Sequence, residues 1–213
     1  MDELRYTLLS DGSANKALMP ILTWLLQQHL PYVAIQGEWA DLRRLPKPPS
    51  RARLAERICV SLDLYPCGLL FVHRDAENVS SAQRFSEING AVHQAQSFIQ
   101  VPPTVSVVPV RMLEAWMLFD LHAIRRAAGN PHGTQSLNLP PLRYLENLAN
   151  PKETLYQILR NASGLRGRRL RSFNHHAVLH RIPEFIEDFS ILRTLHAFRR
   201  LENDTRAAIE SLT

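Results

Sequence analysis

The chain has 213 residues, of which 45% are hydrophobic and 21% charged, and it carries a net charge of +5. This composition supports a folded domain with a real core and excludes disorder, a collagen-like repeat or a coiled coil as a description of the whole chain. No apolar run approaches the ~20 residues of a membrane-spanning helix, and residues 1–5 do not resemble a signal peptide. Two cysteines are too few for a disulfide framework, so we expect a cytoplasmic protein with reduced thiols.

Short apolar, β-prone runs alternate with helical patterns through the first 120 residues. The expected strands cover residues 5–10, 32–35, 69–72 and 105–110, and the expected helices begin near residues 13, 50, 81 and 112. This alternation predicts an α/β fold, namely a four-stranded parallel sheet with helices on both faces. Right-handed crossovers then place the carboxyl ends of all strands at one edge, where sites form in open α/β sheets.

The character of the sequence changes after about Arg126. A turn-rich break follows at residues 129–133, and from Asn150 onward only helices are expected, the last one beginning at Ser190. We therefore expect an α/β domain over residues 1–130 and a helical extension over residues 131–213.

Carboxylates follow three of the four expected strands. Asp11 comes after the first strand, Asp75 and Glu77 after the third, and Glu114 just after the fourth. Asp75 and Glu77 are alternate residues of an extended segment and so face the same way. Clustered carboxylates do not all stay ionised without a cation, and an all-oxygen ligand set favours Mg²⁺ or Mn²⁺. The alternative is that each acid caps a helix at a strand-to-helix turn.

This pattern resembles the Toprim fold, which carries an acid after its first strand and an Asp-x-Asp pair after its third, around a metal. In Toprim nucleases of the overcoming-lysogenization-defect (OLD) type, a second acid stands four residues after the first, and a lysine further along assists at the phosphate. The chain also resembles, from end to end, a family of small bacterial Toprim-like proteins, through residues 65–77, 112–116 and 127–131. The resemblance implies a Mg²⁺ or Mn²⁺ site with ligands at Asp11, Asn15, Asp75, Glu77 and Glu114.

Three positions depart from the Toprim pattern. Asp11 stands where a Glu is usual, the pair is Asp-x-Glu, and Asn15 stands where an acid is expected. Because Asn15 has no charge, we expect a second metal ion to bind more weakly. The alternative is that Asn15 is simply a first-turn helix residue.

Lys152 matches the lysine that the resemblance places at the scissile phosphate, although a first-turn residue of a surface helix would look the same. All but three of the 25 basic residues are arginine, and the other two lysines are Lys16 and Lys47. His73 ends an apolar strand, where packing or capping is its more usual role. The pair His175 and His176 has no third partner at zinc spacing, so we interpret it as a surface or phosphate-contacting pair.

No acid lies between Glu153 and Glu184, but the interval is rich in arginine. These arginines predict a surface that binds a nucleic-acid backbone. The six are Arg160, Arg166, Arg168, Arg169, Arg171 and Arg181. Two alternatives remain open. These arginines could pair with Glu184, Glu187 and Asp188 or with acids on a partner protein, and a GC-rich genome would give the same bias towards arginine without a function.

The first functional hypothesis is a Mg²⁺-dependent Toprim-type nuclease with Asp11, Asp75, Glu77, Glu114 and Lys152 as catalytic residues. The resemblance implies that it works beside an ATPase partner in defence against phage, because the chain has no nucleotide-binding glycine motif of its own. The alternative is a non-catalytic adaptor, in which Asn15 marks a decayed site. The sequence leaves homo-oligomerisation and the choice of DNA or RNA open.

Overall fold

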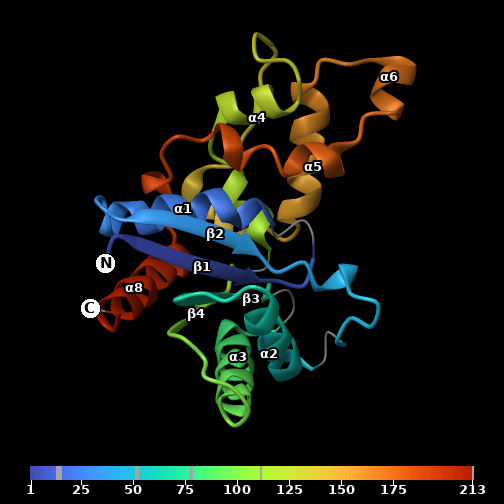
Figure 1. The fold of residues 1–213 in the computed structure, drawn as a ribbon. Helices are drawn as coiled ribbons and strands as arrows, with labels where there is room; N and C mark the ends of the chain where they lie inside the picture. Colours follow the sequence, from blue (N-terminus) through green and yellow to red (C-terminus); the bar gives the residue numbers. More distant parts are fainter. Residues whose placement is uncertain (13–15, 51–52, 77–78, 111, 213) are drawn as a thin grey trace.

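The fold is centred on one parallel sheet. A computed structural model describes residues 1–12, 16–50, 53–76, 79–110 and 112–212. Its four strands lie in the order β2-β1-β3-β4, and every neighbouring pair is parallel. They are β1 (Glu3–Leu9), β2 (Ala34–Trp39), β3 (Leu69–His73) and β4 (Thr104–Val107). The predicted α/β fold with a four-stranded parallel sheet is therefore confirmed (Figure 1).

Two strands differ in extent from the expected ranges. β2 starts at Ala34 and continues to Trp39, whereas the expected strand covered residues 32–35. It is an edge strand with no fully buried residue, so apolar patterning does not mark its length. β4 ends at Val107, before Pro109, a residue that has no amide hydrogen for a strand ladder.

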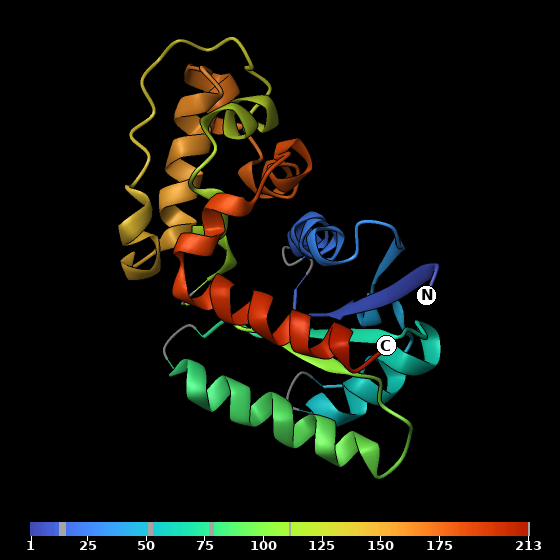
Figure 2. The same cartoon turned by 90° about the vertical axis from the view of Figure 1, so that its left-hand side faces the viewer.

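Helices cover both faces of the sheet, as expected. Figure 2 shows α1 (Leu18–His29) and α8 (His196–Glu210) on one face and α2 (Leu54–Leu64) and α3 (Ser81–Gln96) on the other. The alternation of side chains along β1 divides the core accordingly. Leu4, Tyr6 and Leu8 belong to the hydrophobic cluster on the α1 and α8 side, whereas Leu9 belongs to the cluster on the α2 and α3 side.

The C-terminal region is helical, as predicted. It contains three α-helices before α8: α5 (Pro151–Ala162), α6 (Gly167–Arg171) and α7 (His175–Leu179). The 3-10 turn η4 (Leu142–Asn147) precedes α5, and η5 (Pro183–Phe185) and η6 (Ser190–Thr194) lie between α7 and α8. Leu159 and Phe198 share one hydrophobic cluster with β1 and α1. Residues on both sides of the expected boundary near residue 130 thus pack in a common core, and α8 forms part of a layer on the sheet.

Two helix starts differ from the expected positions. After β4 the chain forms the 3-10 turn η3 (Leu113–Met117), and α4 (Leu121–Ala127) begins only after Asp120, whose Oδ1 accepts a hydrogen bond from Ala123 N at 2.8 Å. Ser190 opens η6, and the last helix, α8, starts at His196. Every helix in the described part of the chain is too short or too polar to traverse a bilayer.

Candidate functional site

The predicted acids lie where three strands end. β1 and β3 are neighbours, and the strands that follow each of them in sequence lie on opposite sides, which creates the crevice where open α/β sheets bind ligands. Leu9 pairs with Val72, and His73 pairs with Val107, so the carboxyl ends of β1, β3 and β4 are level. The structure therefore brings Asp11, Asp75 and Glu114 to one edge. Asn15 and Glu77 lie outside the described residues.

Asp11 is engaged by two arginines. Arg57 of α2 is buried; its Nη1 donates to Asp11 Oδ1, and its Nη2 donates to Ser10 O at 2.7 Å. Arg74, directly after β3, places its Nη1 2.9 Å from Asp11 Oδ2. A buried guanidinium is stable only when it is paired, so Asp11 anchors Arg57 and Arg74. Its charge is already compensated within the chain.

A second carboxylate extends this network to α3. Glu87 accepts from Arg74 and from Arg84, both at 2.8 Å. The Nε of Arg84 also donates to the main-chain oxygen of Asp75 at 3.0 Å. The loop after β3 is therefore tied to α3, and the backbone that carries Asp75 is fixed from this side.

The Asp75 side chain faces the segment after β4. Its Oδ1 accepts from Leu113 N at 3.1 Å and lies 3.4 Å from Nε2 of His73. His73 is buried, and neither of its ring nitrogens has a hydrogen-bond partner among the described residues. The Asp75 side chain is 24% exposed, so it remains open to a ligand from solvent.

Glu114 is a buried carboxyl next to this aspartate. Burial raises the pKa of Glu114; a hydrogen bond from its own backbone opposes the rise, and the negative charge of Asp75 adds to it. The positive charges of Lys152 and His73 act in the opposite direction. Two partly dehydrated carboxylates that repel one another form an arrangement that a cation stabilises.

Lys152 reaches this edge from the first turn of α5. Asn150 caps that helix, because its Oδ1 accepts from Glu153 N at 3.2 Å, and Pro151 occupies the first turn. Lys152 is close enough to Glu114 for their charges to interact, and its Nζ lies 5.9 Å from the ring centroid of Tyr156. The lysine that the resemblance assigned to the phosphate thus lies within the range at which its charge acts on Glu114.

Two residues of this region, Tyr156 and Arg57, were not among the predicted site residues. Tyr156 lies one turn after Lys152, and burial together with the charges of Glu114 and Glu153 raises its pKa to about 12. The four-residue spacing from Lys152 is a signal that could have identified it. Arg57 had a signal too, since it shares the buried side of α2 with Leu54 and Ile58.

Five of the six arginines between Glu153 and Glu184, which we call the arginine tract, are exposed, and Arg160 is half-buried. Arg166, Arg168, Arg169 and Arg171 belong to α6 or directly precede it, and Figure 1 shows α6 at the outer end of the helical region. Within the described ranges, none of these four, nor Arg160, forms an ion pair with a carboxylate within 4.0 Å. The alternative pairing with Glu184, Glu187 and Asp188 is not formed.

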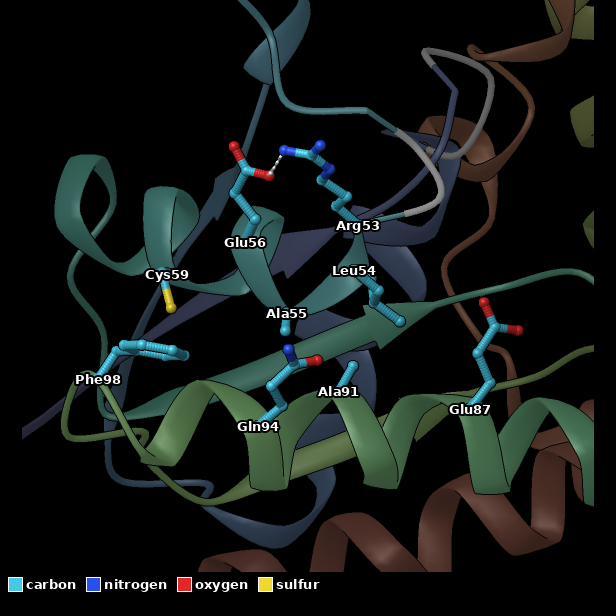
Figure 3. A pocket seen from close by; sticks show the side chains of 9 residues that line it. All are labelled: Arg53, Leu54, Ala55, Glu56, Cys59, Glu87, Ala91, Gln94 and Phe98. Carbon is cyan, nitrogen blue, oxygen red and sulfur yellow. Dashed lines mark hydrogen bonds and ion pairs between the residues drawn. The ribbon is translucent and has the colours of Figure 1, made fainter.

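A groove of about 690 Å³ runs between α2 and α3 (Figure 3). Ala55 and Ala91 face it from the two helices, and Phe98 lies at one end. Burial raises the pKa of the Cys59 thiol on its wall, which keeps that thiol protonated at neutral pH. The groove therefore lacks an activated cysteine nucleophile.

No three His, Cys, Asp or Glu side chains in the described ranges form a group that could hold a metal ion. The described ligand set of the edge therefore consists of two carboxylates, Asp75 and Glu114.

Comparisons with protein-family models, curated proteins and solved structures found no match.

Proposed function

We propose that the chain is a metal-dependent nuclease of the Toprim type, which hydrolyses phosphodiesters at the carboxyl edge of its sheet. The observation that carries this proposal is that Asp75 and Glu114 lie at one edge of the sheet, with Lys152 close enough for its charge to act on Glu114. Two acids and one base at the mouth of an α/β crevice suit a phosphate and a divalent cation.

Asp75 and Glu114 fit Mg²⁺ or Mn²⁺ as the metal. Mg²⁺ is commonly held by one or two carboxylates together with substrate phosphates, and bringing a cation to Glu114 would relieve its repulsion with Asp75. When bound, such an ion activates water and stabilises the charge on a leaving oxygen. We leave Asp11 out of the ligand set because Arg57 and Arg74 already occupy its oxygens.

The basic side chains near the site have separate roles in this proposal. Lys152 binds a non-bridging oxygen of the scissile phosphate, where its charge counters that of the group under attack. Arg160 and the arginines of α6 hold the backbone without reading bases.

A cleavage assay tests the proposal. Purified protein is incubated with linear DNA, supercoiled DNA or RNA in Mg²⁺, in Mn²⁺ or in EDTA. We expect metal-dependent cleavage that falls at least 100-fold in Asp75→Asn, Glu114→Gln and Lys152→Met. The control Asp63→Asn changes an exposed acid of α2 and should cleave normally. Cleavage that persists in EDTA, or equally in all variants, contradicts the proposal.

One observation favours a second candidate, a non-catalytic docking subunit. Asp11, the first acid of the Toprim pattern, forms ion pairs with two arginines. A module that has no need of metal would tolerate this pairing. This candidate predicts no cleavage alone or with the ATPase partner that the resemblance implies in anti-phage defence. It also predicts that the arginine tract binds that partner, which co-purification of wild-type protein and of an α6 variant would reveal.

A further inference from the structure

β2 forms one edge of the sheet, and in the described part of the chain β1 is its single neighbour. Ala34 N donates to Asp2 O at 2.9 Å, and Ala40 N donates to Leu8 O at 3.0 Å. Successive residues of a strand direct their backbone groups alternately to its two sides. The even-numbered residues of β2 therefore bond to β1, and the odd-numbered residues direct their N–H and C=O groups away from the sheet.

Three residues of β2 present these outward groups, namely Ile35, Gly37 and Trp39. The preceding odd-numbered residue, Val33, already donates its N–H to Leu30 O at 3.2 Å. A free edge of this kind is a template for a further strand, and proteins block such edges with lysine, with proline or with a covering element. β2 contains neither lysine nor proline, and none of its residues is fully buried.

The opposite edge of the sheet is protected. β4 has four residues, three of which are buried, α8 packs against it, and Pro109 follows two residues after its end. An exposed aromatic residue stands beside the open edge instead, because Tyr32 lies two residues before β2 and is 97% exposed. Apolar side chains gathered on a surface mark sites of protein contact. The contrast between the two edges indicates that β2 takes a partner.

The side chains of β2 fit an antiparallel copy of the same strand. A two-fold axis through Gly37 pairs Gly37 with itself and Ile35 with Trp39 of the second copy, so that all three outward residues bond across the new edge. Ile35 and Trp39 are both half-buried, and an aliphatic residue opposite an aromatic one stabilises a strand pair. On the other face Gln36 lies opposite Glu38, which sets an amide beside a carboxylate.

The neighbouring registers fit less well. An axis through Glu38 would set two carboxylates opposite one another, and like charges in that position destabilise a strand pair. An axis through Gln36 would set Trp39 opposite Val33, whose N–H is already bonded within the chain. It would also separate Trp39 from Ile35. The register described above is therefore the most favourable of the three.

We propose that β2 binds β2 of a second copy of this chain in antiparallel orientation, with Gly37 on the two-fold axis, so that the two sheets join into one sheet of eight strands. Asp75 and Glu114 follow β3 and β4, on the far side of β1 from this contact. The inference is therefore independent of the proposed nuclease activity. Strands of six residues bury a small area, so the dimer should dissociate on dilution.

Sedimentation velocity at protein concentrations from about 1 μM to 1 mM tests the proposal. We expect the average mass to rise with concentration from 24.3 kDa towards twice that value. Gln36→Lys sets a positive charge opposite Glu38 in both halves of the contact, so the dissociation constant should fall about 3- to 10-fold. Gln36→Glu sets a second carboxylate there and should raise it by a similar factor.

Gln96→Lys and Gln96→Glu are the matched controls, because they make the same charge changes at an exposed residue of α3. Both should dimerise like wild type. A protein that stays monomeric over the whole range overturns the proposal, as do Gln36 variants that behave like the Gln96 variants. Weaker dimers in both Gln36 variants would place Gln36 on the axis and overturn the register proposed here.

Amide hydrogen exchange, followed by NMR, reads the contact without any substitution. The N–H groups of Ile35, Gly37 and Trp39 are bonded in the proposed dimer only, whereas those of Gln36 and Glu38 bond to β1 in monomer and dimer alike. We expect exchange at the first three to slow by at least about 5-fold from the lowest to the highest concentration, with little change at the other two. Exchange that does not depend on concentration at the three residues contradicts the proposal and leaves this edge to a strand of another protein.

Discussion

Arg74 lies 2.9 Å from Asp11 across the crevice between β3 and β1. Each residue stands just beyond the end of its strand, at the level set by the pairing of Leu9 with Val72. With Arg57 as the second partner of Asp11, this ion pair closes one side of the crevice. Asp75 and Glu114 remain as the acids on the other side.

The role of Asp11 can be separated from that of Asp75 by substitution. Asp11→Asn leaves the buried Arg57 without its counterion, and we expect a loss of about 2 kcal/mol in the free energy of unfolding. Divalent-metal affinity should stay unchanged. Urea denaturation and a metal titration of the same variant check both expectations, with Asp63→Asn as control. If Asp11→Asn has normal stability but loses metal binding, Asp11 is a metal ligand after all.

A glycine on β2 is required by the tyrosine beside it. Gly37 pairs with Tyr6, and a Cβ at residue 37 would overlap the Tyr6 ring. That ring is itself held, because its hydroxyl bonds Thr23 Oγ1 at 2.7 Å. We expect Gly37→Ala to reduce the free energy of unfolding by about 1–3 kcal/mol.

The matched control is Gly90→Ala in α3. Nothing lies within 4 Å of a Cβ at residue 90, and alanine suits a helix interior better than glycine. This variant should be more stable than wild type by about 0.5–1 kcal/mol. Denaturation midpoints in urea compare the two, and equal effects of both substitutions would mean that Tyr6 does not restrict residue 37.

The ionised side chain of Glu114 should reduce the free energy of unfolding at neutral pH. Its pKa is raised by burial above the ordinary value of 4.5, so the folded protein holds this proton more tightly than the unfolded chain. Ionising Glu114 therefore destabilises the fold. The effect is absent well below pH 4.5, grows as the pH rises towards the folded pKa and is complete above it.

Replacing Glu114 makes this effect measurable. In EDTA at pH 8, Glu114→Gln should be more stable than wild type by about 0.5–2 kcal/mol, and the difference should vanish near pH 4. Denaturation at several pH values tests this. A variant less stable than wild type at pH 8 would show that Glu114 acts mainly as a stabilising partner of Lys152.

The start of α8 depends on a distant carboxylate. Glu146 accepts from His196 N at 3.0 Å and from Ala197 N at 2.8 Å, whereas the preceding residue, Leu195, provides no cap. Glu146→Ala should reduce the free energy of unfolding by about 1 kcal/mol. Glu187→Ala, an exposed acid before η6, should have little effect in the same thermal melts.

Local patterns predict much of this fold, because buried strands such as β3 are short continuous apolar runs and the helices beside them are amphipathic. From the parallel order it follows that Asp11 and Asp75 share an edge. The side chains that form ion pairs or hydrogen bonds with acidic residues cannot be predicted in this way. Arg57 meets Asp11 across 46 residues, and Glu146 meets Ala197 across 51; such contacts depend on how whole helices pack, which no local spacing encodes.

Binding of Mn²⁺ to the metal-free protein, measured by isothermal titration, tests most directly the claim that this edge is a metal site. We expect saturable binding by wild type, by Asp63→Asn and by Asp11→Asn. We expect affinity at least about 10-fold weaker in Asp75→Asn and in Glu114→Gln. No binding by wild type, or equal binding by all five proteins, would contradict it.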